Sequence, residues 1–113
     1  MAFELGHAAQ RSYLNVRSLK RGWYNGRGEA VDDTLLTLAL RVALKVIPEP
    51  LFSPTVEGGV ELVWADRDLY VELCRDGRVE MLSRKECVEI DIPTGADKVA
   101  TIVQTVKQRL EAS

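Results

Sequence analysis

The sequence predicts an α+β domain in which two helices precede an antiparallel meander sheet of four to five strands, and a third helix packs on one sheet face. Apolar residues recur at helical spacing in residues 1–47 and alternate with polar ones in residues 51–92. Helical spacing then returns in residues 94–112. A length of 113 residues suits one hydrophobic core, so we expect residues 1–113 to form a single domain.

The first predicted helix covers about residues 2–21. Its apolar side chains recur on one face: Leu5, Ala9, Tyr13, Val16 and Leu19. The second starts near Val31, with Asp32 and Asp33 in a first turn where negative charge suits the helix dipole, and ends before Pro48. Its polar residues form only one narrow stripe. We therefore expect the rest of the domain, or a partner chain, to bury this helix.

Five segments predict the sheet: residues 51–56, 60–64, 69–73, 79–82 and 88–92. Pro54 places the first at an edge, because proline cannot donate a backbone hydrogen bond to a neighbour. The short connections predict antiparallel pairing with one buried face. In the last helix, Thr94 is the predicted N-cap, with Asp97 three residues later. The apolar stripe of this helix should pack across the sheet.

Burial of one sheet face fixes the predicted register, since a shift by one residue would turn every side chain to the other face. A tight turn at residues 66–67 sets Leu62 opposite Val71, and a three-residue loop at 75–77 sets Val71 opposite Met81. Both pairings keep the same face apolar.

The same register gathers carboxylates on the opposite face, with Asp91 also pointing that way. The residues predicted to bind a partner are Glu61, Val63, Tyr70, Glu72, Glu80, Leu82 and Glu89. Two main interpretations follow. The glutamates form a solvated face whose repulsion nearby arginines relieve, or they form a docking surface for a partner with a basic surface. A carboxylate metal site is a third interpretation, which the spacing of one strand between glutamates does not favour.

Composition argues against several classes of protein. A net charge of −2 and a pI near 5.4 do not favour nucleic-acid binding. The N-terminus has no basic segment followed by an apolar run, and residues 35–47 are too short to span a bilayer, so we expect a cytoplasmic protein with no membrane association. Its thiols, Cys74 and Cys87, are then reduced. With His7 as the one histidine, we expect no metal or cofactor, no catalytic residue and no enzyme activity.

The segment from Arg21 to Gly28 is an alternative binding site. It combines aromatic and arginine side chains, which can stack on nucleic-acid bases: Arg21, Trp23, Tyr24 and Arg27. It lacks the strand and the Gly-Lys-Ser/Thr sequence of a phosphate-binding loop. The structural interpretation is an Asn25–Gly26 turn with Trp23 packed under the second helix.

Two motifs resemble a family of small uncharacterised bacterial and phage proteins. One is Gly22-Trp23-Tyr24-Asn25-Gly26, which resembles that family's Trp-Asp-Gly-like loop but lacks its Asp after Trp23. The more specific one runs from Pro54-Thr55 through Gly58-Gly59 to Trp64 and resembles a Pro-Thr-x-x-Gly-Gly-Val-x-Leu-x-Trp hairpin. The resemblance covers about residues 14–82 and implies an accessory protein of phages or other mobile elements that neutralises a partner.

These observations favour a non-catalytic protein-binding module of the antitoxin, immunity or phage-inhibitor type. One alternative is a homodimeric structural protein that associates through its apolar second helix or an edge strand. The other is a nucleic-acid binder that uses the Trp23 loop.

Overall fold

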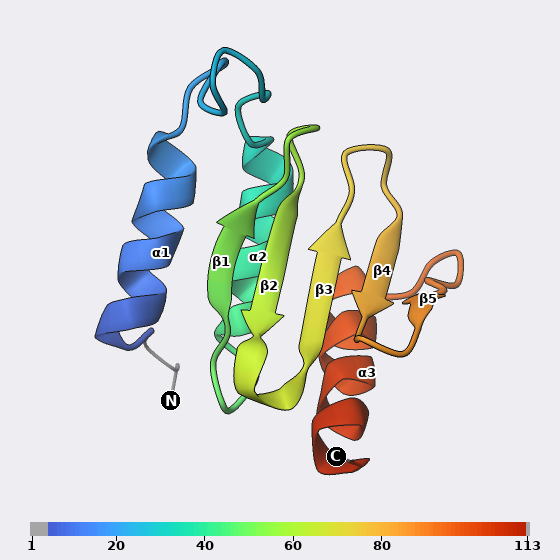
Figure 1. The fold of residues 1–113 in the computed structure, drawn as a ribbon. Coiled ribbons are helices and arrows are strands. Elements are labelled where there is room, and N and C mark those ends of the chain that lie inside the picture. Colours follow the sequence, from blue (N-terminus) through green and yellow to red (C-terminus); the bar gives the residue numbers. More distant parts are fainter. Residues whose placement is uncertain (1–4, 113) are drawn as a thin grey trace.

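The computed structural model describes residues 5–112, which form three α-helices and a five-stranded antiparallel sheet (Figure 1). The predicted α+β class is confirmed. The elements are α1 (His7–Ser18), α2 (Asp33–Ala43), β1 (Leu51–Pro54), β2 (Val60–Trp64), the 3₁₀ turn η1 (Ala65–Arg67), β3 (Leu69–Leu73), β4 (Val79–Leu82), β5 (Cys87–Glu89) and α3 (Lys98–Ala112). The strands lie in the sheet in chain order, β1 to β5, which is a meander.

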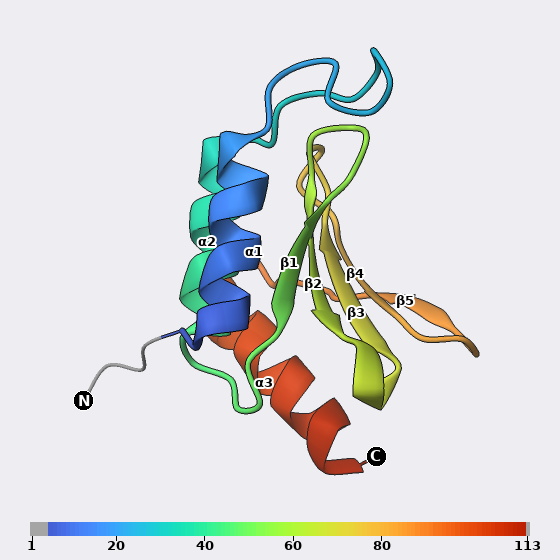
Figure 2. The ribbon, with the colours of Figure 1, turned by 60° about the vertical axis from the view of Figure 1, so that its left-hand side comes forward.

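All three helices lie on one side of the sheet (Figure 2). The core fills the space between these layers, where the inward side chains of β2 and β3 are buried together with those of α2 and α3. In Figure 1 the opposite side of the sheet faces the viewer, with α2 and α3 behind it. We call this uncovered side the open face.

The predicted strand register is confirmed at both central hairpins. Leu62 pairs with Val71, and Val71 pairs with Met81. The turn between β2 and β3 differs from the expected two-residue turn, because residues 65–67 form the 3₁₀ turn η1. Asp68 closes it in the left-handed conformation, with φ of 50°, and donates its backbone N–H to Ala65 O at 3.2 Å.

The helix starts differ from those predicted, because aspartates cap α2 and α3. Asp32 precedes α2 and accepts hydrogen bonds from the backbone N–H groups of Thr34 and Leu35, at 2.8 and 3.2 Å. Asp97 likewise accepts from Ala100 N at 3.1 Å, so Asp97, and not Thr94, caps α3. Both carboxylates satisfy N–H groups that have no partner inside the helix.

Four other elements are shorter than predicted. β1 ends at Pro54, two residues before the predicted end at Val56. α1 spans residues 7–18, and residues 2–4 of the predicted helix lie outside the described part of the chain. The second helix ends at Ala43, four residues before Ile47. β5 ends at Glu89, although Ile90 N still donates to Val79 O at 2.7 Å.

The edge position of β1 is confirmed, and α1 packs beside it. The backbone N–H of Phe52 faces away from β2 and donates to Ser12 Oγ at 2.9 Å. The rings of Tyr13 and Phe52 meet edge to face, with centroids 5.4 Å apart. Helix α1 therefore protects this edge from pairing with another chain.

Candidate functional site on the open face of the sheet

Four glutamates cross the open face on four neighbouring strands, and we call them the acidic row: Glu61, Glu72, Glu80 and Glu89. Each stands directly opposite the next: Glu61 pairs with Glu72, Glu72 with Glu80, and Glu80 with Glu89. The first three are half-buried and Glu89 is exposed. Asp91 was expected to point to the open face from the same strand as Glu89, but β5 ends at Glu89 and Asp91 lies beyond it.

An apolar row runs beside the acidic row. Val63 pairs with Tyr70, and Tyr70 pairs with Leu82. All three are half-buried, although they lie on the side of the sheet that no described helix covers. The strand register thus brings the seven residues of the predicted partner-binding face onto one surface.

Arginines relieve little of the repulsion within the acidic row. The interpretation as a solvated face assigned this role to four of them: Arg67, Arg75, Arg78 and Arg84. Arg78 Nη1 lies 3.4 Å from Glu80 Oε1, while its Nε lies 2.8 Å from Asp76 Oδ2. Arg84 pairs instead with Asp68 at 3.9 Å. Within the described part of the chain, Arg78 is the only arginine that forms an ion pair with the row.

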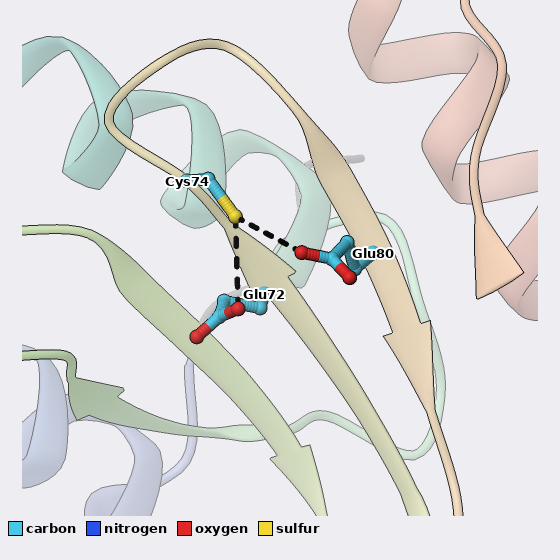
Figure 3. Close-up of side chains that lie close together, drawn as sticks. All are labelled: Glu72, Cys74 and Glu80. Atoms are coloured by element: carbon cyan, nitrogen blue, oxygen red, sulfur yellow. Dashed lines mark hydrogen bonds between the residues drawn. The ribbon is translucent and has the colours of Figure 1, made fainter. Parts of the chain in front are cut away.

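The two cysteines contact the acidic row, which the sequence reasoning did not predict. Cys74 Sγ lies 3.6 Å from Glu72 Oε2 and 3.6 Å from Glu80 Oε1 (Figure 3). Cys87 Sγ donates to Glu80 Oε2 at 3.0 Å. The signal was present in part, because Cys74 follows Glu72 by two residues and side chains at that spacing share a face.

These contacts change the protonation behaviour of the face. Burial, followed by the carboxylates of Glu72 and Glu80, raises the pKa of the Cys74 thiol to about 12, so this thiol is protonated at neutral pH. The hydrogen bond from Cys87 is the main factor that lowers the pKa of Glu80. Burial, and then the charge of Glu72, raise the pKa of Glu61. The centre of the row is therefore a hydrogen-bonded group of thiols and carboxylates.

A hollow of about 580 Å³ lies beside Glu72 and Cys74. Its lining comes from the β1–β2 turn, from β3 and from the turn between β3 and β4: Thr55, Glu57, Glu72, Cys74, Arg75, Asp76 and Arg78. The hollow gives a small ligand or ion access to Glu72 and Cys74.

The Trp23 loop contains the predicted Asn-Gly turn. Tyr24 and Arg27 exchange backbone hydrogen bonds of 2.8 and 2.9 Å around Asn25 and Gly26, which have φ of 53° and 86°. Trp23 Nε1 donates to Glu29 O at 2.8 Å. The backbone hydrogen bonds confirm the turn, and Trp23 contacts Glu29 at the end of its own loop. The predicted packing of Trp23 under the second helix stays a prediction.

The predicted nucleic-acid contacts of this loop remain a prediction. Arg21, Tyr24 and Arg27 are exposed, and Trp23 is half-buried. The loop connects α1 to α2 (Figure 1), and its end is joined to the β1–β2 turn, where Glu29 N donates to Val56 O at 2.9 Å.

The chain matches no protein-family model, no curated protein and no solved structure. The resemblance to the phage and bacterial family therefore stays a prediction. Among residues 5–112, none of the helices has the length and apolar character required to cross a membrane.

Proposed function

We propose that this protein is a non-catalytic binding module that captures a basic partner protein with its open face, in the manner of an antitoxin, an immunity protein or a phage inhibitor. The observation that supports the proposal is the joint placement of an acidic row and an apolar row on the one side of the sheet that no described helix covers.

The opposed carboxylates of the acidic row disfavour the isolated fold, as the raised pKa of Glu61, caused by burial and by the charge of Glu72, indicates. Like charges directly opposite each other on neighbouring strands destabilise a sheet by roughly 0.2–1 kcal/mol per pair. Three such pairs follow one another here, from Glu61 to Glu89. A basic partner would neutralise them, accelerate encounter and disfavour acidic competitors.

The apolar row supplies the other requirement of a protein interface. Protein interfaces combine an apolar centre with polar surroundings, and tyrosine is enriched in them. Val63, Tyr70 and Leu82 would form that centre, with the glutamates along one side.

The structure weakens the observations behind a homodimer. The apolar side chains of α2 are buried within the chain, against the sheet and the other helices: Leu35, Leu36, Ala39, Val42 and Ala43. The β1 edge packs beside α1, which leaves the three-residue β5 as the other sheet edge. Neither feature requires a second copy of the chain.

Charge reversal on the row tests the proposal. The full chain is immobilised and used to capture proteins from a lysate of the source organism, which are then identified by mass spectrometry. We expect the double variant Glu72→Lys/Glu80→Lys to reduce capture of the specific partner by at least about tenfold without lowering Tm, because it replaces attraction with repulsion.

Two further pairs make the result specific. Glu61→Lys/Glu89→Lys changes the same row outside its thiol-bonded centre and should also reduce capture. Asp66→Lys/Glu111→Lys makes an equal change in net charge away from the row and should not. If all three double variants capture the same proteins as the unaltered chain, the open face is not the binding surface.

A further inference from the structure

The centre of the acidic row combines the donor atoms of a metal site. One oxygen of Glu72, one oxygen of Glu80 and the sulfur of Cys74 all lie within 4.8 Å of one another. The three side chains point toward a common position between β3 and β4 (Figure 3). We propose that these three residues bind a divalent transition-metal cation of the Zn²⁺ type. The inference goes beyond the proposed function, because such a site requires no partner protein.

The two sulfur–oxygen distances match tetrahedral coordination. Zn–S bonds of about 2.3 Å and Zn–O bonds of about 2.0–2.2 Å at a tetrahedral angle place sulfur and oxygen roughly 3.5 Å apart. Cys74 Sγ lies 3.6 Å from an oxygen of each glutamate. The oxygens of Glu72 and Glu80 lie within 4.8 Å of each other, and rotation of these two side chains would bring all three donors onto one cation.

The strands hold the ligands in place. Glu72 and Cys74 are two residues apart, so they project from the same face, and Glu80 is paired directly with Glu72. Cys74 remains fixed beyond the end of β3, because its backbone N–H donates to Arg78 O at 2.9 Å. The fourth coordination position would face the hollow, where water can complete the tetrahedron.

The donor set determines which cation fits. One thiolate with two carboxylates suits Zn²⁺, Co²⁺ or Cd²⁺, whereas Mg²⁺ and Ca²⁺ prefer oxygen ligands alone. Binding breaks the S–H bond of Cys74, releases its proton to solvent and forms a metal–sulfur bond, with no change of oxidation state. Arg78, 3.4 Å from Glu80, is the competing cation, and its shorter contact with Asp76 offers it another partner.

Cobalt serves as the spectroscopic probe. Co²⁺ is titrated into the reduced full-length protein, and the thiolate-to-cobalt charge-transfer band is recorded, followed by displacement with Zn²⁺. We expect a saturable band at one cation per chain that Cys74→Ser abolishes. Cys87→Ser is the matched control, since it removes the other thiol of the open face, and it should retain the band. Glu80→Gln should weaken Zn²⁺ binding by about tenfold or more.

Several outcomes would overturn the inference. One is a band that survives in Cys74→Ser, or one that disappears in Cys87→Ser alone, since the thiol ligand would then be a different residue. Another is binding that excess Mg²⁺ competes away, or that does not saturate below about 1 mM, since both indicate only diffuse attraction to carboxylates. Circular dichroism of each variant verifies that lost binding does not reflect lost folding.

The metal site and the partner surface can fail separately. Glu61→Lys/Glu89→Lys leaves all three ligands in place, so it should retain the cobalt band while it reduces partner capture. Cys74→Ser leaves the charge of the row unchanged, so it should lose the band while it retains capture by the metal-free protein.

Discussion

The two faces of this sheet consist of alternate residues of the same strands, yet these residues differ in burial and in charge. On the helix-covered face, Leu62, Val71 and Leu73 have no exposed surface. On the open face, Glu61, Glu72 and their neighbours oppose one another across the ladder. Burial in the core accounts for the residues of β2 and β3 on the first face, but not for the glutamates of the second. The residues that do not serve the fold are therefore the ones to examine for function.

The largest expected effect on stability comes from a comparison of two neighbouring residues, one on each face. Leu62→Ala removes a fully buried side chain and should lower the free energy of unfolding by about 2–5 kcal/mol, because it loses apolar burial and leaves a cavity. Val63→Ala, at the next residue, should lower the free energy of unfolding by less than about 1 kcal/mol, since Val63 is only half-buried and no described helix covers it. Urea denaturation measures both. Equal losses would mean that the open face also contributes to the core.

The next effect tests the hairpin that assigns residues to the two faces. A Cβ atom on Gly59 would lie 2.5 Å from Leu73 O and 2.9 Å from Thr55 Oγ1. Gly59→Ala must therefore push β2 from β3 at the start of their pairing, and we expect a loss of roughly 1–3 kcal/mol. Chemical denaturation measures this loss. An unchanged stability would show that this end of the hairpin shifts freely, and the close pairing of Glu61 with Glu72 would then be in doubt.

The division of residues between the faces could be predicted from the sequence, because it depends on two simple constraints. Alternation assigns Glu61 and Leu62 to opposite sides, and burial of the apolar side excludes a register shift. The cap of α3 could not be fixed in the same way. Thr94 and Asp97 are both good capping residues, and the choice between them depends on where the chain leaving β5 begins its helical turn.

The site was predictable as a surface but not as a cluster. The register places Glu72 beside Glu80, but it does not say which way their side chains turn. Cys74 and Cys87 reach Glu80 from opposite sides through particular side-chain torsions, and β5 itself depends on the loop at residues 83–86. These contacts are set by local geometry, which periodicity does not encode.

The smallest expected effect asks whether the acidic row opposes folding. Glu72 stands between Glu61 and Glu80, so Glu72→Gln relieves two opposed pairs while it keeps an oxygen that accepts the Cys74 contact. We expect the free energy of unfolding to rise by about 0.2–1 kcal/mol in low salt. The gain should shrink as added salt screens the charges. Asp66→Asn, an equal charge change at an exposed position in η1, should have a smaller effect. If Glu72→Gln instead destabilises the protein, the carboxylate serves the fold, and its placement no longer argues for a partner.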